Sequence, residues 1–323
     1  RAGDGWRVRL ALGREIEAHA VVLALGVLAP ASPAAAGADL LASPRYIGDP
    51  WDPKALLDAA ASDVLLIGSG LTMIDAAISL WRPGRRFWAI SRRGLVPRPH
   101  APTAGAAVPM RTAGSPRELF AAVRAASDGG RWREAVDALR PHVQGIWLGW
   151  SLAERRQFLR HVRPWWDVHR HRLAPSVARR IGLMMRGREL VVRAGELTGL
   201  ALTQGGVEAT WRPRGGRVAR RLGVSAVVNC SGFLGDLEQA RDPLLARLLA
   251  TGLIRPDPCR LGAEVDVGSR LVGAGGQAQA GLYAVGPLTR GAFWEITSAP
   301  DIRSQAAGAA QSILSALRRA RAA

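Results

Sequence analysis

The chain has 323 residues, 48% of them hydrophobic, which is enough to bury a sizeable core in about two domains. Its two cysteines, Cys230 and Cys259, form no C-x-x-C pair, so a disulfide framework is excluded and a reducing cytoplasm is the expected location. The net charge of +18 comes from scattered arginines, with Lys54 the only lysine, so we expect no nucleic-acid partner.

Residues 6–25 predict a β-hairpin followed by a third strand. Apolar residues alternate with arginines from Trp6 to Leu10, which is the period of a half-buried strand, and Gly13 suits the turn. The run 21–25 is apolar at every position, as in a strand that is covered on both faces.

The uncharged stretch 20–38 is similar in composition to the apolar core of a signal peptide. Acidic residues precede it, however, and Pro30 interrupts it too early for a membrane helix, so we expect no membrane association. Residues 29–62 are interpreted as a linker with a short helix after Pro53.

A strand, a helix and a second strand are predicted at 64–67, 70–82 and 87–90, which together form one βαβ unit. Gly68 permits the tight turn between strand and helix, and Gly70 lets a pyrophosphate approach the main chain at the positive end of the helix. Met73 occupies the third glycine position, so the motif is incomplete and an ordinary strand–helix turn is the alternative. The residues expected at the dinucleotide are Gly68, Ser69, Gly70, Leu71 and Thr72.

The second strand of this unit ends in Ser91, Arg92 and Arg93, where an NAD-binding fold would place an acid. Arginines at this point can bind a 2′-phosphate through charge-assisted hydrogen bonds, which favours NADPH over NADH. In a chain so rich in arginine, coincidence is the alternative explanation.

Helical patterns follow from about 100 to 188, at roughly 116–127, 131–139, 152–162 and 175–185, and they indicate a helical insertion. Further strands are predicted at 189–195, 207–211 and 217–222, and a fully apolar strand at 225–232. The chain closes with a strand near 281–286 and an Ala-rich helix from about Ile302.

Two short strands that end in glycine, "HAVVLALG" and "SAVVNCSG", bracket the glycine turn. With "GLYAVGPLTRG" they resemble the two-dinucleotide flavoproteins, in which an NAD(P) domain is inserted into an FAD domain. "DPWDP", "IGSGLTMID", "RRGLVPRPH", "FLRHVRPWWDVHRHRLAP" and "FWEITSAPDIRSQA" make the chain similar to bacterial FAD/NAD(P)-binding proteins over nearly its whole length.

This resemblance implies an α/β fold: a Rossmann-like NAD(P) domain at 51–229, with its helical insertion, inserted into a partial FAD-binding domain made of 1–50 and 230–323. It implies FAD and NADP as cofactors and an oxidoreductase that passes a hydride from nicotinamide to flavin and on to an unknown small molecule. In this family an FAD fingerprint precedes the hairpin. No such glycine turn stands before Trp6, so we expect the chain as given to hold FAD poorly.

The resemblance also implies the flavin contacts. Gly26 and Gly232 match the glycine of the bracketing strands, while Leu25 and Ser231 stand in place of its threonine. Gly286 matches the late flavin-binding strand, but Pro287 replaces the aspartate that holds the flavin ribityl chain in most of the class.

Trp294 and Glu295 follow this strand, and we expect the indole beside the flavin ring and the carboxylate as a proton carrier. The alternative is a buried segment before the last helix, capped by Thr297 or Ser298. In "RPWWDVHRHRLAP", His169 is the candidate proton donor, and a helix-packing motif with buried tryptophans is the alternative. Arginines crowd this cluster, so no metal is expected.

Two other functions stay open. A flavin-dependent N-hydroxylating monooxygenase shares this layout, and a dinucleotide-sensing or redox partner-binding protein would need no turnover.

Overall fold

The computed structural model describes residues 5–52, 62–102 and 108–322; the short helix expected after Pro53 lies outside these ranges. The chain divides into two compact units. The first unit comprises Arg1–Leu28, Pro141–Arg156 and Leu234–Ala323, and the second comprises Ala29–Arg140 and Gln157–Phe233. Among the described residues, no helix is both long and apolar enough to cross a membrane.

A seven-stranded sheet forms the centre of the second unit, in the order β4-β10-β5-β6-β7-β8-β9. The first five strands in this order, β4, β10, β5, β6 and β7, run parallel. The last two, β8 and β9, extend the sheet from β7 with antiparallel pairing. This arrangement confirms the α/β fold that the sequence predicted. One strand is shifted: the segment expected at 217–222 begins three residues later, as β9. The strands are β4 (Tyr46–Ile47), β5 (Asp63–Ile67), β6 (Arg86–Ser91), β7 (Leu190–Leu202), β8 (Val207–Pro213), β9 (Arg220–Val224) and β10 (Ala226–Asn229).

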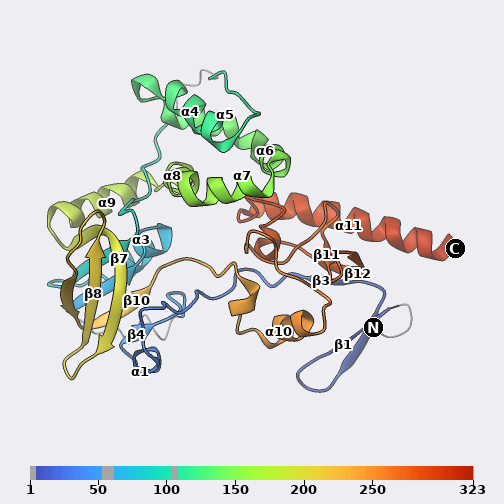
Figure 1. Cartoon of the computed structure of the whole chain (residues 1–323), viewed down its shortest axis with the longest axis horizontal. Helices are drawn as coiled ribbons and strands as arrows, with labels where there is room; N and C mark the ends of the chain where they lie inside the picture. Colours follow the sequence, from blue (N-terminus) through green and yellow to red (C-terminus); the bar gives the residue numbers. More distant parts are fainter. Residues whose placement is uncertain (1–4, 53–61, 103–107, 323) are drawn as a thin grey trace. The chain divides into compact units, whose positions relative to one another are not determined.

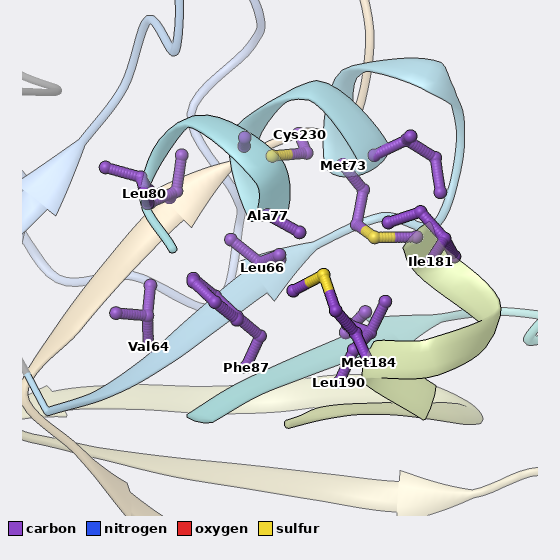
Figure 2. Packing of buried hydrophobic residues seen from close by; sticks show 14 of the residues in the cluster. Val64, Leu66, Met73, Ala77, Leu80, Phe87, Ile181, Met184, Leu190 and Cys230 are labelled. Carbon is purple, nitrogen blue, oxygen red and sulfur yellow. The ribbon is translucent and has the colours of Figure 1, made fainter. Parts of the chain in front are cut away.

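The predicted βαβ unit is present as β5, α3 (Leu71–Ser79) and β6. Figure 2 shows how α3 and α9 (Pro175–Arg186) cover one face of the sheet, with Met184 pointing toward Leu66 and Phe87 and Met73 toward Ile181 of α9. The spacing i, i+3, i+4 and i+7 puts four residues on the face of α3 that packs on the sheet, and each of them is at most 4% exposed. They are Met73, Ala76, Ala77 and Leu80.

The opposite face of the sheet is covered by the segment that the sequence suggested to be a linker. Leu40, in the short helix α1 (Ala38–Leu41), is fully buried against Leu65 and Val227, and Ala36 bridges to Leu200. These contacts place residues 29–50 in the second unit, and the limits of the FAD- and NAD(P)-binding domains stay a prediction.

The helical region contains more separate helices than its sequence pattern indicated. They are α4 (Pro116–Ala126), α5 (Trp132–Leu139), α6 (Val143–Gly149), α7 (Leu152–Gln157), a π-helical turn (Phe158–Val162) and α8 (Arg163–Arg170). Ser115 starts α4 with a capping box, since its hydroxyl accepts from the Glu118 N–H and Glu118 accepts from the Ser115 N–H. Residues 141–156 belong to the first unit, within which the Trp147 indole donates to the Gly291 carbonyl at 2.8 Å.

In the first unit, β1 (Trp6–Arg9) and β2 (Glu15–Ala18) form the predicted hairpin, with Gly13 at φ +80°. A three-stranded sheet has the order β11-β12-β3. Its β3 spans only Val21–Leu23, and Val22 is 41% exposed, so the expectation of a strand covered on both faces was wrong here: Leu23 packs in the core, and Val22 points to the opposite side. The remaining elements are β11 (Arg270–Val272), β12 (Ala278–Ala284), α10 (Pro243–Ala250) and the long α11 (Ala299–Ala322), which leads to the C-terminus in Figure 1.

Candidate dinucleotide-binding site

The turn after β5 requires glycine at position 68. Gly68 has φ +108°, and its N–H donates to the Ile90 carbonyl of β6 at 2.8 Å. A Cβ at this position would lie 2.4 Å from the carbonyl oxygen of Cys230, at the end of β10. The chain therefore passes between two neighbouring strands at a point where no side chain fits.

Gly70 has a different environment. It caps α3 in an extended conformation with φ −83°, and a Cβ built on it would meet nothing within 4 Å. The helix has no side-chain cap and no acidic residue in its first turn, which starts with Leu71 and Thr72. The first N–H groups of an α-helix have no partner within the helix, so with the positive helix end and the open space beside Gly70 they fit a phosphate group.

Ser69 lies between these glycines and is 7% exposed. Its hydroxyl forms a 2.7 Å hydrogen bond with the Ser91 hydroxyl and donates to the Leu95 carbonyl. Ser91 also accepts from the Gly94 N–H at 3.0 Å. Both hydroxyls have partners within the protein, so a contact from Ser69 to a cofactor would use the main chain.

The two arginines after β6 differ in their surroundings. Arg92 is exposed, and no hydrogen bond or ion pair to another described residue is found for it. Arg93 is half-buried and donates to the main-chain carbonyl of Arg160 in the π-helical turn at 3.0 Å.

The Cys230 thiol beside the glycine turn is 3% exposed. Burial, together with the nearby Asp75 carboxylate, raises the pKa of this thiol to about 12. Burial also raises the pKa of Asp75. Cys230 is therefore a protonated packing residue near neutral pH rather than a reactive thiolate.

The structure brings Gly26 and Gly286 to the same edge of the three-stranded sheet. Their strands β3 and β12 are parallel, with Leu23 opposite Ala284, and the Val285 N–H donates to the Leu23 carbonyl at 3.0 Å. Gly26 and Gly286 have φ of +69° and +81°, and a Cβ on either would meet nothing within 4 Å. Adjacent carboxyl ends of parallel strands are a typical place for a ligand in α/β folds. Gly232, at φ +95°, is equally open but belongs to the second unit.

Sequence reasoning missed the buried polar group that holds Gly286. The Gln305 side chain accepts from the Gly286 N–H at 2.7 Å and donates to the Thr289 hydroxyl at 2.8 Å. Thr289 in turn donates to the Gly286 carbonyl at 2.8 Å. Pro287 has no N–H to offer. The short 3-10 turn that starts there is thus fixed by α11, and nothing in the local sequence pattern marked Gln305 as its partner.

Trp294 is 1% exposed, and its ring stacks on Trp147 with centroids 4.8 Å apart and an angle of 26°. The Arg290 guanidinium lies 4.4 Å from the Trp294 ring centroid. Glu295 is half-buried, and Ser298 caps α11, as the sequence suggested. These contacts agree with a buried segment before the last helix, and the proximity of Trp294 and Glu295 to a flavin stays a prediction.

His169 packs between helices of the second unit. Its Nδ1 lies 2.8 Å from the Trp165 carbonyl, and its ring meets the Trp132 ring edge-on at 4.9 Å. Burial, with the charges of Arg98 and Arg172, lowers the pKa of His169 despite that hydrogen bond. A neutral imidazole with Nδ1 protonated offers Nε2 as an acceptor. The role of His169 as a proton donor stays a prediction.

The arginine-rich cluster around His169 contains one buried tryptophan, Trp166, whereas Trp165 is 37% exposed. Arg163 and Asp167 form an ion pair at 3.2 Å. Within the described ranges, no group of three or more metal-ligating side chains is found here or elsewhere.

Comparison with known proteins gives a partial match by sequence and an extensive match by structure. No family model matches the chain. Uncharacterized proteins of Mycobacterium tuberculosis (strain ATCC 25618 / H37Rv) and Mycobacterium bovis are 33% identical over 114 residues. That match spans 33% of this chain and 20% of the relative's length.

Solved structures match the chain over nearly all its residues. L-lysine 6-monooxygenase from Pseudomonas syringae has a TM-score of 0.62 and 20% identity, covering 99% of this chain and 68% of its own. An ornithine N-hydroxylase from Kutzneria sp. 744, whose complex contains reduced FAD, NADP+ and L-ornithine, has a TM-score of 0.56 and 17% identity over 98% and 68%. Thioredoxin reductase from T. acidophilum has a TM-score of 0.53 and 13% identity, covering 98% of this chain and 71% of its own. The chain has the fold of FAD- and NAD(P)-binding flavoprotein oxidoreductases.

Proposed function

We propose that this protein is an FAD- and NADPH-dependent oxidoreductase. The observation that carries the proposal is the pair of glycines in the turn between β5 and α3. Gly68 is required because a Cβ would strike the Cys230 carbonyl, whereas Gly70 leaves open space before an uncapped helix. A strand–helix turn that only connected two elements would need the first glycine but not the second.

The residues of the second unit fit the nicotinamide dinucleotide. Main-chain N–H groups at Leu71 and Thr72 would hold its pyrophosphate at the helix end, and Gly70 would let it approach. The exposed Arg92 guanidinium, directly after β6, would bind a 2′-phosphate, which supports NADPH rather than NADH.

The glycines Gly26 and Gly286, side by side at the edge of the smaller sheet, fit the second dinucleotide. Gly232, in the second unit, is proposed separately as a dinucleotide contact. When bound, FAD supplies a flavin that accepts a hydride from the nicotinamide and passes the electrons to an acceptor. Pro287 cannot donate a hydrogen bond there, so Gly286 and its buried support by Gln305 would fix the main chain toward the flavin.

Trp294 and Glu295 follow this edge directly, and we propose that they border the flavin ring, with the Glu295 carboxylate moving a proton. His169, in the second unit, would accept a proton through Nε2.

We propose that the electron acceptor is a small molecule and that the protein acts in a reducing cytoplasm. The free cysteines Cys230 and Cys259 support the reducing location.

The experiment is NADPH oxidation followed at 340 nm with added FAD, with and without candidate acceptors, and repeated with NADH. Acceptor-dependent oxidation that is faster with NADPH supports the proposal. Oxidation stimulated by a primary amine, with a hydroxylated amine as product, would identify the second candidate, an N-hydroxylating monooxygenase; the TM-scores of 0.62 and 0.56 to such enzymes favour including amines in the panel. Nucleotide binding without turnover under any condition would indicate a sensing protein instead.

A further inference from the structure

The hydrogen bonds around Ser69 and Ser91 have only one consistent direction. The Leu95 carbonyl can only accept, so it takes the single hydrogen of the Ser69 hydroxyl. Ser69 must then accept from Ser91, whose oxygen accepts from the Gly94 N–H. Both hydroxyl hydrogens are used within the protein, so neither serine can donate to a phosphate.

Because of this network, the loop at 91–95 is fastened to the glycine turn at both ends. Gly94 has φ +62°, and a Cβ on it would lie 3.0 Å from the Ala194 nitrogen of β7, so the loop also lies tight against the next strand. The side chains of Arg92 and Arg93 therefore leave the loop from a fixed main chain.

Arg93 is committed to a partner that proline creates. In an α-helix the Arg160 carbonyl would accept from the N–H of residue 164, but Pro164 has none. The Arg93 guanidinium donates to this carbonyl at 3.0 Å. Arg93 thus connects the loop after β6 to the π-helical turn before α8, whereas Arg92 stays exposed.

We infer that the two adjacent arginines have separate roles: Arg92 alone recognises the 2′-phosphate of the adenosine ribose, and Arg93 is a positioning residue that fastens the loop to the helical region through the Arg160 carbonyl. This inference rests on the proposed dinucleotide site and assigns its specificity to one side chain.

The test uses the full chain and isothermal titration with adenosine 2′,5′-bisphosphate and adenosine 5′-monophosphate, which differ only in the 2′-phosphate. We expect the bisphosphate to bind more tightly. Arg92→Ala should lower its affinity about tenfold to a hundredfold, as for a lost charged hydrogen bond, and leave the monophosphate unchanged.

Arg93→Ala should lower bisphosphate affinity less, and it should have no further effect when combined with Arg92→Ala, because it acts through Arg92. Arg93→Lys should keep the preference for the bisphosphate over the monophosphate, because the Arg160 carbonyl needs only one donor. Arg92→Lys should lose most of that preference, because lysine cannot make the two-point contact of a guanidinium with a phosphate. Pro164→Ala, which restores a competing N–H, should weaken the preference only while Arg93 is present. Circular dichroism and the melting temperature confirm that each variant is folded.

The inference would be overturned if Arg92→Ala still preferred the bisphosphate over the monophosphate. It would also be overturned if the losses of bisphosphate affinity in Arg92→Ala and Arg93→Ala added up in the double variant. Equal binding of both nucleotides by the unmutated chain would overturn it and leave the proposed site standing. Binding of neither nucleotide would overturn the proposed function as well.

Discussion

The carbonyl oxygen of Cys230 occupies the space that a side chain at Gly68 would need, at a distance of 2.4 Å from its Cβ. Two segments far apart in the sequence, the ends of β5 and β10, meet at this point because the strands are parallel neighbours. The neighbouring Gly70 has no such contact. This difference separates the effect of each glycine on the fold from its effect on binding.

Gly68→Ala should destabilise the protein by more than about 2 kcal/mol, because it adds both a clash and a strained φ of +108°. Gly70→Ala should cost only about 0.5–1 kcal/mol as a poorer helix cap, but it should abolish NADPH binding by blocking the approach of the pyrophosphate. Thermal unfolding and titration with NADPH measure the two effects. If Gly70→Ala bound NADPH normally, the phosphate would not lie at this turn.

The lowered pKa of His169 predicts how stability depends on pH. The native state resists protonation, whereas the unfolded state takes up a proton near the ordinary pKa of 6.5. As the pH falls from about 6.5 toward the lowered pKa, the unfolded state binds more protons and stability decreases; above this window the contribution is complete.

His169→Asn keeps a donor for the Trp165 carbonyl but cannot titrate, so its stability should fall less steeply between pH 6.5 and lower values. Urea unfolding at a series of pH values measures this slope. The exposed His161, at which the same replacement can be made, provides the control for removing a histidine. An unchanged slope in His169→Asn would show that the imidazole is already charged in the native state.

Gln305 and Gln311 lie on the same helix, but only Gln305 is buried. Gln305→Leu would leave the Gly286 N–H without its 2.7 Å partner, and we expect a loss of about 1–3 kcal/mol, the usual cost of an unsatisfied buried polar group. Gln311→Leu should be nearly neutral. Melting temperatures compare the two variants, and equal values would mean that water or another group replaces Gln305.

The two thiols should differ in reactivity. Cys230 is buried and its pKa is about 12, so an aromatic disulfide reagent at pH 8 should modify it only after unfolding. Cys259 is half-buried, and burial with the Asp257 charge raises its pKa, so it should react slowly but first. Mass spectrometry of the labelled peptides distinguishes the sites. Early labelling of Cys230 would mean that β10 and the glycine turn separate in solution.

The sequence by itself determined the local units of this protein. The spacing from Val64 to Ile90 predicted β5, the glycine turn, α3 and β6, because periodicity and glycine angles act over a few residues. It also predicted the hairpin at Gly13 for the same reason, and of the two candidate caps of the last helix, Thr297 and Ser298, the structure selects Ser298.

Only the tertiary structure decided which distant groups support the candidate site. Trp147 reaches Gly291 across 144 positions of sequence, Arg93 reaches Arg160 across 67, and Gln305 fixes Gly286 across 19. Such contacts form between single side chains and single carbonyls or N–H groups, and they leave no periodic pattern in the chain. Local spacing therefore predicted the glycine turn, whereas packing alone decided which distant side chains hold Gly291, Gly286 and the turn at Arg160.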